Sequence, residues 1–448
     1  MGRNKKEAPR RSPKTRTRAL SVIFIAVGCA GLIFFGVSYY LAGNNDLQKH
    51  EVDIAVKMQS FRSKLQEQIG PYLLHSQLKE DVELTLDGEK QNVKLSYTIE
   101  PLLQIEAEKL LKSYKPDYGA IVVMNAETGQ ILAMASFQRN GDSGLNLALR
   151  GTYPAASVFK IVTATAAIDK YMLSPDTLIM FNGGNHTLYK RNVMNTQVNR
   201  WTREMSLREA FARSINAVFG RISLEKLQPK DLREYAVRFG FNQNIQTDLP
   251  FDPGFTDIPE EKSFHLAEVA SGFNRITTMS PIQGAMIAAS IANDGVMRVP
   301  YIIENVHDDK GIELFKSEPV TAAVTMTKAG AERLKDLMGA TVHKGTGRKS
   351  FRNLVRDRKF VDLEMGGKTG SLQGLNPKGK VDWFVGYAIG ENDKIAVAAL
   401  TVNIDRWQVK SAHLAQDMLR KRFGSQFSKE NEKFFKTSAA STQDPEQH

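Results

Sequence analysis

The chain has 448 residues, of which 42% are hydrophobic, so it can bury one large core or two ordinary cores and is not a disordered protein. The formal net charge of +11 would suit a nucleic-acid-binding protein, but eight Lys or Arg and a single acid, Glu7, fall within residues 1–18. Most of the excess charge therefore belongs to a short basic tail, and no nucleic-acid partner is expected.

An apolar run without any charge follows this tail, from Ala19 to Ala42. At about 1.5 Å per residue it is long enough to cross the hydrocarbon core of a bilayer. Positive charge precedes the run, which predicts a cytoplasmic N-terminus and an exported remainder. A cleaved signal peptide is the alternative, although the run is long for one and no clean small-x-small site follows. The only cysteine, Cys29, lies inside the run, so the exported part has no disulfide.

Residues 43–96 have the composition of a juxtamembrane stalk. Ile54, Met58, Phe61 and Leu65 recur at helical spacing among polar residues, which predicts an amphipathic helix. This helix either packs on its own domain or binds a partner, and dimerisation through residues 47–69 stays open. Alternation in residues 82–86 and 93–97, around Asp87-Gly88, predicts a hairpin.

The remaining pattern predicts a sheet that the chain leaves and later rejoins, covered by helices. Beyond the last helix, residues 424–448 are mostly polar and are expected to be disordered. The expected strands are Gly119–Met124, Gln130–Ala135, Met365–Lys368, Trp383–Ala388 and Ile395–Val402, and the expected helices are Ile105–Tyr114, Ser157–Tyr171, Leu207–Leu224, Pro281–Asn293, Lys328–Val342 and Lys410–Phe423.

No motif for a metal or a cofactor is present in the sequence. The eight histidines are scattered and show no zinc spacing. Gly367-Lys368-Thr369 contains the triplet that ends a phosphate-binding loop, but position 362, where that loop needs its first glycine, is Asp. Neither a cofactor nor a metal is therefore expected.

Ser157-Val158-Phe159-Lys160 opens a predicted helix and places a serine and a lysine on one helical face. A serine hydroxyl needs a base to become a nucleophile, and a lysine desolvated by apolar neighbours can be neutral and act as that base. The alternative is an ordinary helix start with a solvated lysine, because this pattern also occurs by chance.

Two further segments strengthen the catalytic interpretation. Ser214-Ile215-Asn216, within the predicted helix Leu207–Leu224, offers a hydroxyl for proton relay and an amide for holding a carbonyl. Lys368-Thr369-Gly370-Ser371, at the end of an apolar strand, offers a cation and hydroxyls suited to a terminal carboxylate. Each alone also fits a polar helix face or a strand-end turn, but the ordered trio is the signature of penicillin-binding proteins and class A β-lactamases.

The sequence resembles the penicillin-binding transpeptidases over residues 97–423, about three quarters of the chain. The segments that carry the resemblance are 97–104, 153–160, 292–295 with Pro300, 366–373 and 383–387. The resemblance implies an α+β fold: a mostly antiparallel central sheet covered by helices, with an all-helical subdomain. It also implies a monofunctional serine D,D-transpeptidase that cross-links peptidoglycan stem peptides on the outer face of a bacterial cytoplasmic membrane and is acylated by β-lactams.

The resemblance also implies a role for each motif residue. Ser157 attacks a D-alanyl-D-alanine carbonyl with Lys160 as base, and Ser214 passes the proton to the departing D-alanine. The other implied roles are donor orientation by Asn216, support of the relay by Lys368, binding of the terminal carboxylate by Thr369 and Ser371 next to Gly370, and an oxyanion hole made by the backbone N–H groups of Ser157 and Ser371.

Some alternatives stay open at this point. D,D-carboxypeptidase activity uses the same motifs, and a non-catalytic scaffold or β-lactam sensor of a wall-synthesis complex would act through the stalk. A β-lactamase is disfavoured because no glutamate for deacylation is evident. The 43–96 segment leaves no room for a glycosyltransferase or a large non-catalytic domain, so wall-synthesis or division partners are only a possibility through the stalk. Ala155 and Ala156 depart mildly from the family's usual turn before the serine.

Overall fold

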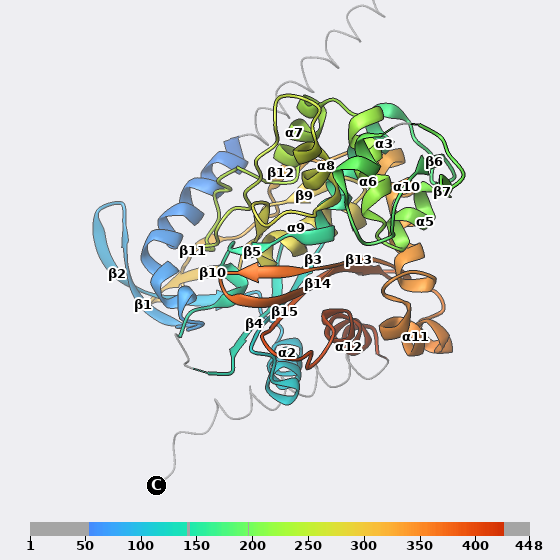
Figure 1. Cartoon of the computed structure of the whole chain (residues 1–448). Helices are drawn as coiled ribbons and strands as arrows, with labels where there is room; N and C mark the ends of the chain where they lie inside the picture. The colour runs from blue at the N-terminus through green and yellow to red at the C-terminus, as the bar shows by residue number, and fades with distance from the viewer. Residues whose placement is uncertain (1–52, 141–143, 196, 425–448) are drawn as a thin grey trace, which may run out of the picture. The chain divides into compact units, whose positions relative to one another are not determined.

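The computed structural model describes residues 53–140, 144–195 and 197–424 (Figure 1). The chain divides into two compact units, residues 1–57 and 58–448, and the second holds the five-stranded and the four-stranded sheet. The expected basic tail, the expected anchor at residues 19–42 and, apart from Gly424, the expected disordered tail at 424–448 lie outside the described residues. In the described part of the chain, no helix combines the length and apolar character that a bilayer crossing requires.

A five-stranded antiparallel sheet forms the centre of this unit, in the order β13-β14-β15-β3-β4. Its strands are β3 (Tyr118–Asn125), β4 (Ile131–Gln138), β13 (Glu364–Leu375), β14 (Lys378–Ile389) and β15 (Lys394–Asn403). The chain leaves the sheet after β4 and rejoins it at β13, as the sequence predicts. This mixture of helices with an antiparallel sheet confirms the coarse fold class.

Both faces of the sheet are covered, which explains why its strands are apolar almost throughout. Side chains of β3 alternate between the two cores: Val122 and Met124 belong to one, Ile121 and Val123 to the other. Figure 1 shows α2, α11 and α12 on one side of the sheet and α9 with the remaining helical region on the other. The sheet is thus the middle of three layers.

Helices supply the outer layers, and most lie where the apolar spacing predicts them. The long apolar helix α9, for example, is buried along its whole length against β14, β15 and β3. The helices are α2 (Pro101–Tyr114), α3 (Lys160–Tyr171), α4 (Lys190–Met194), α5 (Leu207–Ala212), α6 (Asn216–Glu225), α7 (Pro229–Arg238), α8 (Phe264–Ser271), α9 (Pro281–Ala292), α10 (Lys328–His343), α11 (Arg348–Arg356) and α12 (Ser411–Phe423), with 3₁₀ turns η1 (Leu147–Leu149), η2 (Ala156–Phe159) and η3 (Arg358–Phe360).

A second sheet, β1-β2-β10-β11, packs with residues 58–74 of the N-terminal helix, which spans residues 53–74. The rings of Phe61 and Phe315 stack at 4.2 Å, and Leu65 is fully buried, so this helix packs on its own domain. The hairpin expected around Asp87-Gly88 is present, and its second strand also pairs with β10. The strands outside the central sheet are β1 (Asp81–Leu86), β2 (Glu89–Tyr97), β5 (Tyr153–Pro154), β6 (Leu178–Phe181), β7 (Arg203–Ser206), β8 (Thr278–Met279), β9 (Val296–Arg298), β10 (Ile303–Asp308), β11 (Glu313–Lys316) and β12 (Thr321–Val324).

Two expectations from the sequence are wrong in ways that matter for function. The predicted helix Leu207–Leu224 is two helices, α5 and α6, because the chain breaks at Ser214, whose φ is +58°. Lys368 does not end a strand but lies inside β13, which continues to Leu375 through complete pairing with β14. Apolar spacing continued through the break and stopped within the strand, so the sequence misplaced both boundaries.

Candidate active site

The nucleophile candidate lies in a 3₁₀ turn at the start of a buried helix. Ser157 is half-buried in η2, and Lys160, the first residue of α3, is fully buried. Lys160 Nζ lies 2.8 Å from Ser157 Oγ. Ala156, just before the serine, has a φ of +49°, which is strained for a residue with a side chain. The turn is therefore held in place by its surroundings rather than by local preference.

Its neighbours orient the lysine amine. Besides Ser157, Nζ contacts Asn216 Oδ1 at 2.7 Å and the carbonyl oxygen of Ser271 at 2.5 Å. The Asn216 amide donates from Nδ2 to the His186 carbonyl, so its Oδ1 is fixed toward the lysine. Both of these oxygens can only accept hydrogen bonds. A neutral amine that donates to both presents its lone pair to the Ser157 hydroxyl.

Burial favours the neutral amine. Desolvation, with the nearby Lys368 amine as a smaller cause, lowers the pKa of Lys160 well below its ordinary value. Desolvation also lowers the pKa of Lys368 to about 7. Since both side chains are fully buried, neutral Lys160 can accept a proton near neutral pH.

A second hydroxyl and amine form a matching pair. Lys368 Nζ lies 2.9 Å from Ser214 Oγ and also donates to the Thr369 carbonyl at 2.8 Å. Ser214 stands at the break between α5 and α6, where its positive φ turns the chain between the two helices. Asn216, the first residue of α6, then reaches Lys160. The break therefore joins the two lysines through one short segment.

Strand β13 brings the carboxylate-binding candidates to the same place. A Cβ added to Gly370 would lie 3.3 Å from the Ser157 backbone nitrogen, so the strand passes close to the nucleophile turn. Thr369 is half-buried and Ser371 is exposed. β13 is the edge strand of the central sheet, so its outer side is not covered by another strand of that sheet.

Three contributors were missed by sequence reasoning. The carbonyl of Ser271 contacts Lys160, and a Cβ on Gly272 (φ +65°) would lie 1.8 Å from the Ala156 oxygen. Thr346 Oγ1 lies 2.5 Å from Thr369 Oγ1, and its backbone nitrogen donates to the Ala212 carbonyl. The small residues at 270–272 and 345–347 hinted at close backbone approach, but nothing in the sequence says what they approach.

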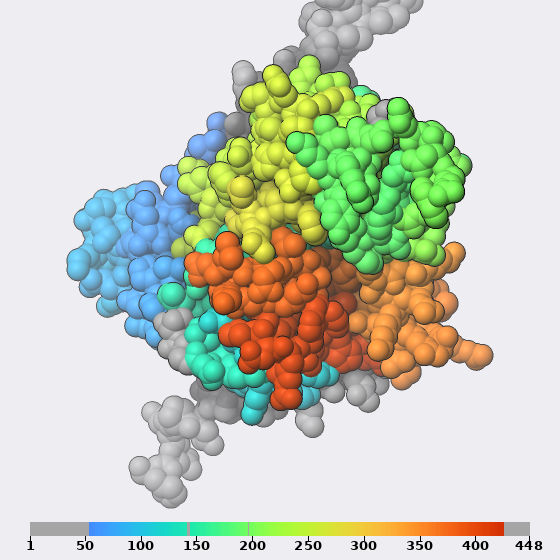
Figure 2. Space-filling view, viewed as in Figure 1, coloured from blue at the N-terminus to red at the C-terminus, as the bar shows by residue number. Residues whose placement is uncertain are grey.

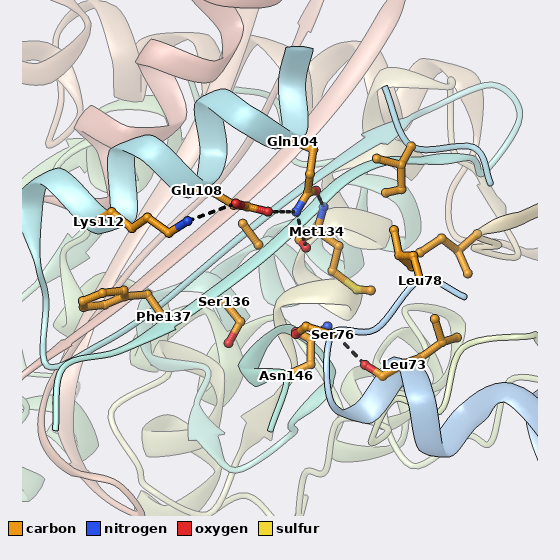
Figure 3. A pocket seen from close by; sticks show the side chains of 13 residues that line it. Leu73, Ser76, Leu78, Gln104, Glu108, Lys112, Met134, Ser136, Phe137 and Asn146 are labelled. Carbon is orange, nitrogen blue, oxygen red and sulfur yellow. Dashed lines mark hydrogen bonds and ion pairs between the residues drawn. The ribbon is translucent and has the colours of Figure 1, made fainter. Parts of the chain in front are cut away.

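A separate pocket of about 190 Å³ lies away from these motifs (Figure 3). It is bounded by the end of the N-terminal helix, α2 and β4, and Gln104 at its side hydrogen-bonds the backbone of Met134. No motif residue lines it. Among the described residues, no cluster of His, Cys, Asp and Glu could hold a metal ion.

Comparisons with known proteins agree with this arrangement. The family model of the penicillin-binding protein transpeptidase domain matches residues 119–421. Stage V sporulation protein D of Bacillus subtilis is 23% identical over 71% of this chain and 49% of its own length. Peptidoglycan D,D-transpeptidase PbpA of Mycolicibacterium smegmatis is 26% identical over 68% of this chain and 66% of its own. The chain thus spans about half to two thirds of these relatives.

Solved structures show the same fold. The D,D-transpeptidase domain of a peptidoglycan glycosyltransferase from Eggerthella lenta is similar with a TM-score of 0.62 and 26% identity, over 76% of this chain and 85% of that one. Penicillin-binding protein A from M. tuberculosis, as an imipenem acyl-enzyme complex, has a TM-score of 0.61 and 21% identity, over 74% and 79% of the two chains. The chain belongs to the penicillin-binding protein transpeptidase family.

Proposed function

We propose that this protein is a serine D,D-transpeptidase that cross-links peptidoglycan stem peptides. The observation that carries the proposal is the Ser157–Lys160 pair, in which a buried, neutral amine directs its lone pair to a serine hydroxyl. The relatives named as peptidoglycan D,D-transpeptidases and the β-lactam acyl-enzyme structures of the same fold support this choice.

In the first half-reaction, Lys160 takes the hydroxyl proton as Ser157 Oγ attacks the carbonyl of the penultimate D-alanine. A C–O bond forms and the peptide C–N bond breaks, which leaves an acyl-enzyme and free D-alanine. The departing amine needs a proton, and the proton held by Lys160 reaches it through Ser214 Oγ, which hydrogen-bonds Lys368 Nζ. Lys160 is therefore neutral again in the acyl-enzyme. With a pKa of about 7, Lys368 can give or take that proton near neutrality.

Substrate is held along the edge strand. The unpaired side of β13 can hydrogen-bond an extended peptide as an added strand. Thr369 and Ser371 bind the terminal carboxylate, and the charge of that carboxylate raises the pKa of Lys368 when substrate is bound. Backbone N–H groups of Ser157 and Ser371 form the oxyanion hole, and Asn216 orients the donor peptide.

The second half-reaction decides the product. An amine of a neighbouring stem peptide attacks the acyl carbon, its proton returns through Lys160 to Ser157, and a cross-link results. Water in place of the amine gives D,D-carboxypeptidase activity. No cofactor or metal takes part, and β-lactams acylate Ser157 in the same way as the donor.

We also infer where the protein is located and which proteins it contacts. Residues 19–42 anchor the protein in the bacterial cytoplasmic membrane with the catalytic domain outside, and residues 43–96 connect the anchor to the transpeptidase domain at 97–423. The charge pattern around the apolar run supports this orientation. Contact with wall-synthesis or division proteins through the stalk is part of the same proposal.

The test is covalent labelling of the full chain with a fluorescent penicillin. The parent is expected to give a covalent band, and Ser157→Ala none. Lys160→Arg, which is always charged and so cannot accept the proton, is expected to slow acylation by at least about 10²-fold. A folded parent that is not labelled would contradict the proposal and favour a non-catalytic scaffold. Labelling of folded Ser157→Ala, or a Lys160→Arg rate equal to the parent rate, would refute the assigned nucleophile or base.

A further inference from the structure

Exposed cations are concentrated on α11 and the turn that follows it. Within residues 348–360 the only acid is Asp357, which lies 4.0 Å from Arg420 and hydrogen-bonds the backbone of Lys359. We call the exposed cations of this segment the cationic stripe: Arg348, Lys349, Arg352, Arg356, Arg358 and Lys359. None of them forms an ion pair with another residue in the described part of the chain. Figure 2 shows the orange segment around residue 350 at the surface of the molecule.

This stripe is fixed beside the catalytic strand. Phe351, on the buried side of α11, stacks on Phe384 at 4.9 Å, and Phe384 is paired with Thr369 in the register of β13 and β14. The helix also begins directly after the turn in which Thr346 contacts Thr369. Its cations therefore extend outward from the carboxylate-binding end of the site.

No ion pair between the described residues gives the stripe a role in holding the fold together. Arg348, Arg352 and Arg356 follow one another at four-residue intervals, so like charges line one helical face and repel. A stripe without internal partners is suited to an external anion. A helix that binds a bilayer needs a free apolar face, but Phe351 and Leu354 of α11 are buried in the core. A polyanion in water is therefore favoured over a lipid surface.

We propose that the cationic stripe binds the uncross-linked glycan strand that carries the donor stem peptide, through the terminal carboxylates of neighbouring stems. This inference rests on the proposed function. Each uncross-linked stem ends in the same carboxylate as the donor, so the strand is a polyanion. From Arg348 to Arg356 the stripe extends about 12 Å along the helix. One exposed ion pair contributes little binding energy, but several pairs along one strand add up. The stripe therefore binds a strand with many stems more tightly than a single stem.

The experiment compares affinities of the full chain, in neutral detergent and with Ser157→Ala to prevent turnover. The ligands are uncross-linked strands polymerised in vitro and the single-stem fragment that a muramidase releases from them. Combining Arg348→Gln, Arg352→Gln and Arg356→Gln is expected to weaken strand binding about tenfold at low salt and to leave fragment binding unchanged. Added salt is expected to weaken strand binding by the parent, so that its affinity approaches that of the arginine variant.

The matched control removes three exposed lysines that lie elsewhere, Lys226→Gln, Lys230→Gln and Lys262→Gln. Unchanged strand affinity in the arginine variant, or an equal loss in the lysine control, overturns the proposal. If the arginine variant loses binding to anionic phospholipid vesicles but keeps its strand affinity, the stripe binds the membrane instead.

Penicillin labelling of the triple arginine variant, made with Ser157 intact, shows whether its catalytic site is still folded. If the triple variant is not labelled, a double variant with only Arg352→Gln and Arg356→Gln is measured in its place. Failure of the proposed function appears separately, as an unlabelled parent.

Discussion

Two fully buried lysines are the most costly residues of the site. Lys160 contacts three oxygens and Lys368 contacts two, and no carboxylate is among these partners. Burial is the main cause that lowers the pKa of each amine. A protein interior tolerates such groups only by keeping them neutral, and that neutral state is the one a proton acceptor needs.

Stability is expected to depend on pH through Lys368. Its pKa is about 7 in the folded protein and 10.5 ordinarily, so between these values the unfolded chain binds more protons and stability rises with pH. Lys368→Met removes this contribution. The melting temperature of Lys368→Met is therefore expected to exceed that of the parent. The difference should be larger at pH 7 than at pH 9.5, because the cost of burying the lysine is larger at the lower pH. Thermal melts at the two pH values measure the difference, and a difference that grows with pH would refute the assignment.

Thr346 is expected to act on substrate binding through Thr369. The hydroxyls of Thr346 and Thr369 lie 2.5 Å apart, so one of them orients the other toward a carboxylate. Thr346→Val is expected to raise the penicillin concentration at half-maximal acylation by about fivefold, with the maximal rate almost unchanged. Thr346→Ser should restore the parent value. A fall in the maximal rate alone would instead give Thr346 a role in the chemical step.

At the scale of elements, the site is assembled where regular structure is interrupted. The proposed nucleophile Ser157 lies in a 3₁₀ turn, Ser214 in the break between α5 and α6, and Ser271 at the end of α8. Ala156 and Ser214 both have positive φ values, a conformation that costs about 1–3 kcal/mol for each residue. Packing between these elements maintains the strain, and Gly272 leaves no room for a Cβ beside the Ala156 oxygen.

Gly272→Ala is expected to disturb the nucleophile turn although it changes no catalytic group. The new Cβ would lie 1.8 Å from the Ala156 oxygen, and Gly272 has a φ of +65°, so the turn or α8 must shift. We expect penicillin acylation to fall by at least about tenfold, because small displacements of reacting groups are costly. Gly311→Ala, also at positive φ but with open space around its Cβ, is the control. Equal acylation by both variants would show that the contact is unimportant.

At the scale of the whole molecule, buried polar contacts tie the N-terminal helix to distant segments. Arg62 is fully buried, with its guanidinium 4.1 Å from the centre of the Tyr301 ring and one nitrogen donating to the Glu318 carbonyl. Burial raises the pKa of the nearby Asp248 carboxyl above its ordinary value, and the charge of Arg62 offsets part of this rise. Asp248 accepts hydrogen bonds from the backbone of Ile302 and Ile303, where β10 begins.

Arg62→Met is expected to destabilise the protein by about 1–3 kcal/mol, because it leaves the Glu318 carbonyl without its donor and removes the cation that offsets the burial of Asp248. The loss should be larger at pH 7 than at pH 4, since protonation of Asp248 removes the unpaired charge. Thermal melts of this variant are compared with those of Lys64→Met, which lies on the same helix with an exposed side chain. Similar melting temperatures for the two variants would mean that the Arg62 contacts add nothing.

Sequence alone determined much of this protein. Apolar spacing located α2, α9, α10, α12 and the five strands of the central sheet, because segments that bury an apolar face must show it in their pattern. The three motifs identified the family and the candidate site residues. The domain boundaries, the anchor and the role of each residue remain predictions.

Only the tertiary structure decided how the motifs meet. The break at Ser214 and the course of β13 past Lys368 depend on long-range packing, which local spacing cannot report. The same holds for Ser271, Gly272 and Thr346, whose contributions come from backbone position and close approach. Residue type determines which chemistry is possible, but burial lowers the pKa of Lys160, and neighbours that lie 56 and 111 positions away in the chain direct its amine toward Ser157.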